Sequence, residues 1–432
     1  MSLRGAVFPG WPVNGGAVQA VEPVRTARIR FNPIDPAFHA DPYPTYAQMR
    51  RDAPHLRALG TLVLTRYADV VAALKTRDLS VALIPETIER AARRLDVGDI
   101  SEISRFIRQS IVFTDNPAHL KLRRLVNAAY SPAMLTAVER TVDVQVSALL
   151  DAIDARGGTA DFIADFARPL PVNVLCAWMR VPEARRAWIA EHIHMVRHLL
   201  DPGLINRDRL VRTRTSLRTL TSFFVDHLRT IGDDDGVIGA LTIARDDGDR
   251  LDEIDIAFAC IMTFVAGTET TESLVGNLFD TLLAHPDALA ALRDDRSLID
   301  AAVDESIRFE TPLQMTKRIA RAPQSINGID VRADEQILLC LGAANRDPEA
   351  FDAPDTFRPD RRGPPHVGFG YGMHACLGAA LARMQAARSV AYSLERYAHW
   401  RRTSPDVRWQ THSVILRGRG ALPIQFAKDG VA

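Results

Sequence analysis

The sequence predicts a mainly α-helical fold with a small β part. Apolar residues recur at helical spacing over most of the chain, whereas strand-like runs are few and short. Residues 31–432 contain no internal repeat and no low-complexity linker, which favours one continuous unit over a string of modules. With 432 residues and 47% hydrophobic content, the chain is long enough to bury a large core.

The first 30 residues are rich in glycine and proline. They lack the apolar segment of about 7 to 15 residues that marks a signal peptide. We therefore expect residues 1–30 to form a flexible arm and residues 31–432 to form a single domain.

Helical periodicity and runs of β-forming residues give the elements in chain order. The predicted helices cover residues 44–51, 118–129, 134–155, 182–199, 209–230, 252–284, 298–309 and 377–398. The predicted strands cover residues 61–67 and 336–342. The helix over 252–284 is unusually long, and His285-Pro286 ends it.

Charge and cysteine content exclude several classes of protein. Lys plus Arg and Asp plus Glu number 53 each, so no global field attracts nucleic acid or an anionic membrane. The longest apolar run, residues 257–267, falls short of the roughly 20 residues that span a bilayer. The cysteines are few and scattered, which is typical of a reducing compartment. We expect a soluble, cytoplasmic protein with no nucleic-acid or membrane partner.

The long helix over 252–284 is interrupted by AGTETTES at residues 266–273. Gly267 and the threonines replace good helix formers at a cost of roughly 0.5 to 1 kcal/mol each. A threonine hydroxyl can bond the carbonyl one turn back, so the helix can open locally and admit water or a ligand. The interruption indicates either a functional site or a notch where another helix crosses.

A single cysteine, Cys376, lies among glycines, histidines and aromatics in HVGFGYGMHACLGAALA, residues 366–382. A predicted helix follows directly, and its N-terminus favours the thiolate form of the cysteine. The glycines allow a tight backbone beneath a flat ligand, with Phe369 as an apolar cover. The pattern indicates a thiolate directed at a planar cofactor. A zinc site is the alternative, but His374 and Cys376 supply only two ligands.

The run Phe369-Gly370-x-Gly372-x-His374-x-Cys376-x-Gly378 resembles the haem-binding signature of the cytochrome P450 family of haem-thiolate monooxygenases. The resemblance extends over nearly all of residues 31–432 and is strongest to soluble bacterial members. It implies a cytochrome P450 fold in which heme b, iron protoporphyrin IX, lies between the threonine-bearing helix and the helix after the cysteine. It also implies that Cys376 is the axial metal ligand, whose electron donation favours cleavage of the O–O bond of dioxygen.

The resemblance assigns further residues to the cofactor and to the fold. Glu305 and Arg308 match the Glu-x-x-Arg motif of the family, with Arg361 as the third member of a buried structural network. The propionates need cationic or hydrogen-bonding donors. The implied cofactor-binding residues are His119, Arg123, Arg318, His366, Phe369, His374 and Cys376.

The interruption of the long helix acquires a catalytic meaning from the resemblance. Glu269 and Thr270 match the acid and alcohol pair of the family. Thr270 is expected to bond the oxygen and Glu269 to feed protons through water, while Ala266 and Gly267 leave room for O₂. The implied reaction inserts one oxygen atom from O₂ into an apolar small molecule, as a hydroxylation or epoxidation.

The substrate and partners follow only by analogy with soluble bacterial relatives. A polyketide, macrolide or terpenoid skeleton in natural-product biosynthesis is the favoured substrate. The alternatives are a catabolic or fatty-acid hydroxylase or peroxygenase, and a haem-binding sensor or carrier without turnover. Electrons are expected from a separate ferredoxin and ferredoxin reductase, with a basic docking patch of Lys121, Arg124, Arg361, Arg362 and Arg383. His192, His194 and His198 are expected on a polar side of the pocket roof.

Overall fold

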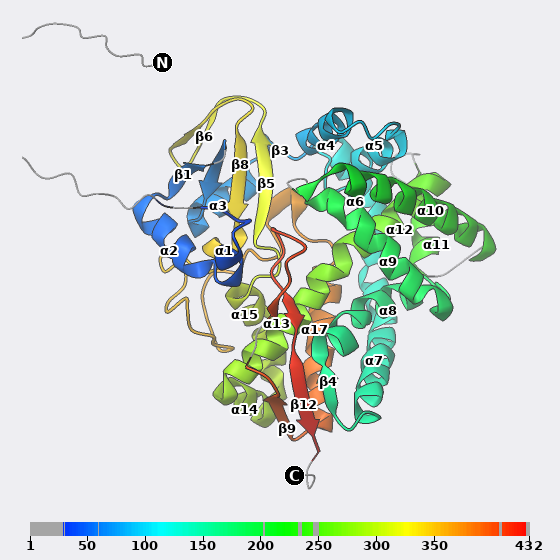
Figure 1. The fold of residues 1–432 in the computed structure, drawn as a ribbon, viewed down its shortest axis with the longest axis vertical. Helices are drawn as coiled ribbons and strands as arrows, with labels where there is room; N and C mark the ends of the chain where they lie inside the picture. The colour runs from blue at the N-terminus through cyan, green and yellow to red at the C-terminus, as the bar shows by residue number, and fades with distance from the viewer. Residues whose placement is uncertain are drawn as a thin grey trace, which may run out of the picture.

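A computed structural model describes residues 29–428, except residues 30, 59, 202–203, 232–235, 245–249 and 406–407. The predicted N-terminal arm lies almost wholly outside the described residues. Figure 1 shows a helical part that holds most of the chain, with a smaller sheet beside it. This arrangement matches the predicted fold class.

The predicted helices differ from the observed ones by a few residues at their ends, and the structure adds helices that were not predicted. In the first half of the chain they are α1 (Pro36–Ala40), α2 (Tyr43–Asp52), α3 (Tyr67–Lys75), α4 (Leu83–Arg94), α5 (Ser101–Arg108), α6 (Ala118–Asn127), α7 (Pro132–Asp154), α8 (Pro169–Trp178), α9 (Arg186–Val196) and α10 (Arg207–Ile231). The second half contains α11 (Val237–Ile243), α12 (Glu253–Gly267), α13 (Glu269–Ala284), α14 (Pro286–Asp294), α15 (Ile299–Phe309), α16 (Leu341–Ala344) and α17 (Ala379–Arg396). The helices that were not predicted are α1, α3, α4, α5, α8, α11, α14 and α16.

The strands are short, as the sequence predicts. They are β1 (His55–Ala58), β2 (Thr61–Leu64), β3 (Leu79–Ser80), β4 (Thr159–Asp161), β5 (Met315–Ala320), β6 (Gln324–Ile326), β7 (Ile329–Val331), β8 (Gln336–Cys340), β9 (His399–Arg402), β10 (Arg408–Trp409), β11 (Arg419–Ala421) and β12 (Pro423–Ala427). The largest sheet has the order β1-β2-β8-β5-β3, in which only the β2–β8 pair is parallel. Leu62 lies opposite Ile337 in that pair, and both side chains are fully buried.

The long predicted helix is two helices, α12 and α13, separated at Thr268. Asp252 caps α12 in a capping box with Asp255, which fixes where the helix starts. Thr268 has ψ −69°, and α13 begins at the next residue. The threonine-rich segment therefore interrupts the helix, as its composition predicts.

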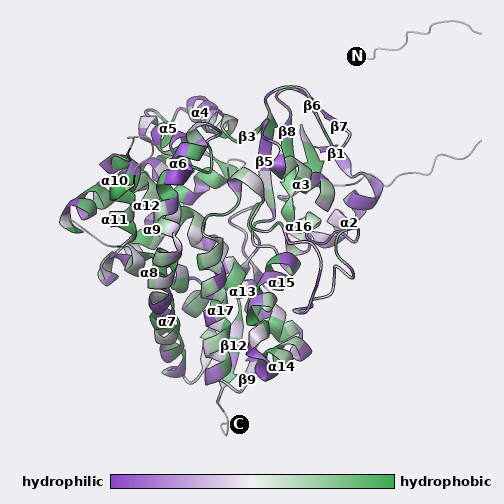
Figure 2. Ribbon diagram, turned by 180° about the vertical axis from the view of Figure 1, so that it is seen from behind, coloured by the Kyte–Doolittle hydropathy of each residue, from purple (hydrophilic) through white to green (hydrophobic). Residues whose placement is uncertain are grey.

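By length and composition alone, the combined stretch Glu253–Ala284 could cross a membrane. This was not expected from the sequence, because its uninterrupted apolar runs are shorter than a membrane span. Half of its most apolar part is buried inside the protein. Helices in the core of a folded protein have the same composition, because they are surrounded by other apolar side chains. Figure 2 shows hydrophilic residues gathered on peripheral helices such as α4, α5 and α6.

Candidate active site

One cavity of about 620 Å³ unites the segments that the sequence singled out. Its walls come mainly from α12 and α13, from α6, from β5 and from the loop around Cys376. Ala266, Gly267 and Thr270 line it from the helical side, and Phe369 and Cys376 line it from the loop. Most of the other lining side chains are apolar, so the cavity can hold a flat hydrophobic group together with a second small molecule.

The loop before Cys376 requires glycine. Gly370 and Gly372 have φ +70° and +69°, in the left-handed region that other residues rarely adopt. A Cβ at Gly372 would also come within 2.9 Å of the Leu74 carbonyl oxygen. The backbone N–H of Cys376 donates to the Phe369 carbonyl at 2.9 Å, which closes the loop. The sequence folds this way because any side chain at these glycines would strain or block the turn.

Cys376 differs from the other cysteines in facing open space. Cys176, Cys260 and Cys340 are buried among neighbouring side chains, whereas Cys376 is exposed and lines the cavity. Desolvation by the protein around the cavity raises the pKa of the Cys376 thiol above its ordinary value, whereas the Gly378 N–H and the charge of Arg123 lower it. The start of the helix therefore favours the thiolate, as expected from the sequence, but desolvation outweighs this effect. A bound metal cation deprotonates a coordinating thiol outright.

A cluster of buried nitrogen-bearing side chains lies at one side of the cavity. His119 is buried with both ring nitrogens unpartnered, and Nε2 of His374 is also buried without a partner. The two rings lie 4.3 Å apart. Burial lowers the pKa of His374 to about 3 and also lowers the pKa of His119. Unsatisfied buried donors of this kind indicate a missing partner with acceptor oxygens.

Arg318 on β5 completes this cluster. Its side chain is 6% exposed, and it donates only to Thr316 Oγ1 at 3.2 Å and to the Lys317 carbonyl at 2.7 Å. Among the described residues, no carboxylate forms an ion pair with it. Burial lowers the pKa of Arg318 to about 10. A buried guanidinium without a counter-ion beside two unpartnered histidines suits an anionic group in the cavity.

The structure places Arg123 and His366 differently from the rest of this cluster. Arg123 lines the cavity, but its Nη1 donates to the carbonyls of Met373 at 3.1 Å and Ala375 at 2.7 Å, so it braces the cysteine loop. His366 does not line the cavity: its Nε2 lies 3.4 Å from Asp304 Oδ1, and its Nδ1 accepts the Gly368 N–H at 3.2 Å. His366 is therefore not part of the cluster of His119, His374 and Arg318.

Thr270 and Glu269 have different surroundings at the start of α13. The Thr270 hydroxyl lines the cavity and donates to the Ala266 carbonyl at 2.7 Å. Glu269 does not line the cavity. Its Oε1 lies 2.8 Å from His194 Nδ1, and its Oε2 lies 2.7 Å from Arg197 Nε and 3.2 Å from His412 Nε2.

The surroundings of Glu269 keep its carboxylate charged. Burial alone would raise its pKa, but the hydrogen bonds from His194 and His412 and the charge of Arg197 outweigh burial. The pKa of Glu269 is therefore held well below its usual range. Sequence reasoning missed this cluster of Arg197, His194 and His412 around Glu269, although it had placed His194 at the pocket roof.

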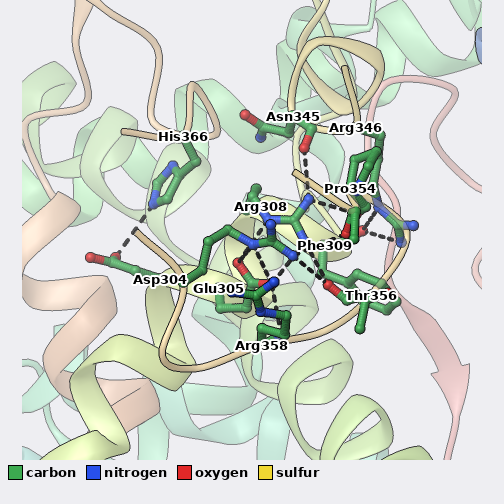
Figure 3. A network of polar contacts seen from close by, with 12 residues as sticks. Asp304, Glu305, Arg308, Phe309, Asn345, Arg346, Pro354, Thr356, Arg358 and His366 are labelled. Atoms are coloured by element: carbon green, nitrogen blue, oxygen red, sulfur yellow. Dashed lines mark hydrogen bonds and ion pairs between the residues drawn. The ribbon is translucent and has the colours of Figure 1, made fainter. Parts of the chain in front are cut away.

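The structure brings Glu305, Arg308 and Arg361 together behind the cysteine loop. Arg308 donates to both Glu305 oxygens at 2.7 and 2.8 Å, and Arg361 Nε donates to the same oxygens at 3.0 and 3.1 Å. Figure 3 shows Arg308 also reaching the carbonyls of Asn345 and Pro354, at 2.9 and 2.8 Å. The network joins α15 to the following loop and leaves no buried charge unpaired.

Taken together, the fold and the cavity define a helical protein that holds a planar, anionic cofactor on a cysteine. Comparison with known proteins agrees with that class. The family model for cytochrome P450 matches residues 218–417. Cytochrome P450 107B1 from Saccharopolyspora erythraea is 33% identical over 91% of this chain and 96% of its own length. Cytochrome P450 monooxygenase PikC from Streptomyces venezuelae is 31% identical over 90% of this chain and 92% of its own length.

Solved structures show the same likeness. The crystal structure of CalO2 matches with a TM-score of 0.85 and 29% identity, over 93% of this chain and 100% of that one. The chain therefore belongs to the cytochrome P450 family, and its cofactor is heme b. The predicted family, fold and cofactor are confirmed.

The residues present fit this cofactor. The unpartnered donors of His119, His374 and Arg318 suit the propionates, Cys376 offers sulfur to the iron, and the glycine loop leaves a flat surface beneath it. Phe369 lies between His366 and the cavity and can shield the sulfur from water.

Proposed function

We propose that this cytochrome P450 inserts one oxygen atom from O₂ into an apolar small molecule during natural-product biosynthesis. One observation carries the proposal: Cys376 and the Thr270 hydroxyl line the same largely apolar cavity, from the loop and from the helix. A haem carrier has no use for a hydroxyl at a helix interruption beside the cofactor. The monooxygenase class itself agrees with the name of the relative PikC.

The polyketide or macrolide substrate class rests on the relatives. One of them is 6-deoxyerythronolide B hydroxylase from Saccharopolyspora erythraea, 30% identical over 90% of this chain and 97% of its own length. Another is the polyketide biosynthesis cytochrome P450 PksS from Bacillus subtilis, 28% identical over 93% of this chain and 100% of its own length. Terpenoids remain within the proposed class, because most of the cavity lining is apolar, as a terpenoid skeleton requires.

Each part of the cavity wall has a task in this reaction. When bound, heme b activates O₂ with electrons delivered from outside. Cys376 holds the iron through its sulfur, and the Thr270 hydroxyl can donate or accept a proton at the cavity face of α13. The apolar side chains Met262, Leu313 and Met315 orient the substrate and exclude water.

The electrons are proposed to come from a separate ferredoxin and its reductase. The predicted basic patch changes in one respect: Arg361 is 8% exposed at its side chain and is held by Glu305, so it cannot dock a partner. Leu120 on α6 and Tyr371 in the cysteine loop are exposed at 45% and 41%. Arg123 joins these two segments, so they can form one docking surface with Lys121 and Arg124. We propose that the protein is a single domain in the cytoplasm, where a separate ferredoxin can reach this docking surface.

The test is a search for substrate followed by isotope labelling. Macrolide lactones, terpenoids and long-chain fatty acids are screened for a spin-state change in the absorption spectrum of the haem-loaded protein. The best binder is then incubated with ferredoxin, ferredoxin reductase, NADPH and ¹⁸O₂. One ¹⁸O atom in the product supports the proposal. NADPH-independent turnover with hydrogen peroxide would instead indicate a peroxygenase, and no product with any donor would indicate a carrier.

A further inference from the structure

A charged cluster beside the cavity surrounds Glu269, and Arg197 is its member that lines the cavity. Its members come from three separate parts of the chain: His194 lies on α9, Arg197 starts the short 3₁₀ helix Arg197–Leu200, and His412 lies in the turn before β11. All three reach the Glu269 carboxylate within 3.2 Å. The cluster lies directly behind Thr270, because Glu269 and Thr270 are adjacent in α13.

The exposure of these side chains is graded. His194 and His412 are 42% and 40% exposed, Glu269 is 14% exposed, and Arg197 is 2% exposed. Each histidine presents one ring nitrogen to Glu269, which leaves its other nitrogen for water. The two rings lie 5.5 Å apart. The histidines therefore stand between solvent and the carboxylate, whereas Arg197 backs the carboxylate from the interior.

Glu269 is poorly suited to store a proton. Its carboxylate accepts two hydrogen bonds and pairs with a buried guanidinium, all of which favour the ionised form. Imidazole, in contrast, takes up and releases protons in the neutral range. The proton that the acid and alcohol pair needs must therefore arrive from a neighbour of Glu269.

We propose that His194 and His412 are positioning residues that carry protons from solvent to Glu269, which passes them to water beside Thr270. The inference rests on the proposed monooxygenase function. In each transfer, a hydronium ion gives a proton to the outer ring nitrogen and becomes water, while the N–H bond of the inner nitrogen breaks and its proton moves to the carboxylate. Glu269 then releases that proton toward the cavity. The imidazole regains its first tautomer when its outer nitrogen returns one proton to water and its inner nitrogen takes one from water. One proton enters and one leaves.

Other charged groups face this cluster and set its electrostatics. Burial lowers the pKa of His198 to about 4, so His198 stays neutral, although its ring lies 5.5 Å from that of His194. Burial raises the pKa of Glu272 to about 7, and its Oε1 lies 3.1 Å from Arg168 Nε. Asp201 is occupied by Ser413 Oγ and the Val414 N–H, at 2.7 and 3.0 Å. Glu272 is thus the one rival proton holder in this group.

The first test replaces each histidine by the amide that keeps its hydrogen bond. Asparagine mimics Nδ1 and glutamine mimics Nε2, so the double variant is His194→Asn with His412→Gln. His192→Asn is the matched control, because His192 lies on the same helix but faces the Trp188 carbonyl at 2.9 Å. We expect the double variant to form product about 100-fold more slowly, the lower end of the contribution of a positioned proton-transfer group. We also expect a larger solvent deuterium isotope effect and a flatter pH–rate profile.

The second test does not depend on turnover. Long-range ¹H–¹⁵N spectra of ¹⁵N-histidine-labelled, haem-loaded protein report the tautomer and hydrogen bonding of each imidazole. Glu269→Ala should change the ring-nitrogen signals of His194 and His412 and leave those of His192 in place.

The outcomes separate the two proposals. If the double variant has the same isotope effect and pH–rate profile as the wild type, the histidine route is overturned. If instead Glu272→Gln alone changes the isotope effect and the pH–rate profile, the route runs through Glu272. Unchanged ring signals in Glu269→Ala would overturn the cluster itself. If the wild type inserts no oxygen at all, the monooxygenase proposal fails, and the histidine route fails with it even where the spectra show the cluster.

Discussion

Arg197 Nε lies 2.7 Å from Oε2 of Glu269. Arg197 lines the cavity, whereas Glu269 does not. The pair is buried on the Arg197 side and reaches solvent through two histidines. Thr270, the next residue, faces the cavity. Of the acid and the alcohol that the sequence predicts as one catalytic pair, only the alcohol lines the cavity, together with Arg197, the ion-pair partner of the acid. Water or a rotation of Glu269 must connect them.

Thr270→Ala should uncouple oxygen consumption from product formation. The variant loses the hydroxyl at the cavity face but keeps the helix interruption, so haem binding should be retained. We expect most reducing equivalents to appear as hydrogen peroxide, measured against product and NADPH consumed. Thr268→Ala is the control, because the Thr268 hydroxyl also bonds a carbonyl one turn back, at 2.9 Å, but does not line the cavity. Equal coupling in the two variants would contradict a role for Thr270 in proton delivery.

Cys376→Ser should remove sulfur from the iron. Serine fits the loop, because it keeps the Cβ and the N–H that donates to the Phe369 carbonyl. The reduced, carbon-monoxide-saturated protein should therefore lose the red-shifted Soret band of thiolate ligation. Cys340→Ser, a substitution at a buried cysteine outside the cavity, should keep that band. The same band in Cys376→Ser would exclude Cys376 as the ligand.

The sequence predicted the fold well where local periodicity decides it. The helix expected over 134–155 is α7, Pro132–Asp154, because its apolar spacing and the Ser131 cap both mark its limits. The interruption at Thr268 was also predictable, since glycine and threonines in a helix carry a local signal. The cysteine loop was predictable for the same reason, because its glycines are required by their own φ angles.

Contacts between distant segments were not predictable from spacing. His194, Glu269 and His412 meet only because α9, α13 and a C-terminal turn pack together, and none of them carries a local mark of the others. His366 stands next to the haem-binding motif, yet its ring turns to Asp304 on α15. The desolvation of Cys376 also depends on the whole cavity, and it opposes the lowering of the pKa by the Gly378 N–H that the sequence indicates.

Arg318→Leu should weaken haem retention. Arg318 is a buried cation with no ion pair among the described residues, so a propionate would gain a charge-assisted hydrogen bond there. The loss of one such bond corresponds to about 1.5 to 3 kcal/mol, or roughly 10- to 100-fold faster haem transfer to an acceptor protein. Arg332→Leu, at an exposed site directly after β7, should leave the transfer rate unchanged. Equal rates in both variants would place the propionates elsewhere.

Glu305→Gln should destabilise the fold without touching the cavity. The substitution leaves Arg308, 2% exposed, without its anionic partner. Breaking a buried pair of this kind costs about 3 to 5 kcal/mol, which urea unfolding of the haem-loaded protein can measure. Asp360→Asn removes an exposed partner of Arg358 and should cost less than about 1 kcal/mol. A small loss in Glu305→Gln would show that the network is not important for stability.

Glu272→Gln should change how stability depends on pH. Burial raises the pKa of Glu272 from 4.5 to about 7, with Arg168 acting against the rise and Glu269 adding to it. The folded state therefore binds this proton more tightly than the unfolded state. That contribution is complete below about pH 4.5 and is lost as the pH rises toward 7.

Glutamine mimics the protonated acid at every pH, so the variant should gain stability relative to the wild type between pH 5 and pH 8. The gain has an upper limit of about 3 kcal/mol, and partial exposure of the side chain reduces it. Glu253→Gln removes an exposed surface carboxylate on α12 and is the control, whose difference from the wild type should stay nearly constant. Urea unfolding at several pH values measures both differences. A constant difference for Glu272→Gln would mean that Glu272 is already ionised in the folded protein, and Glu272 would then cease to be a rival proton holder beside Glu269.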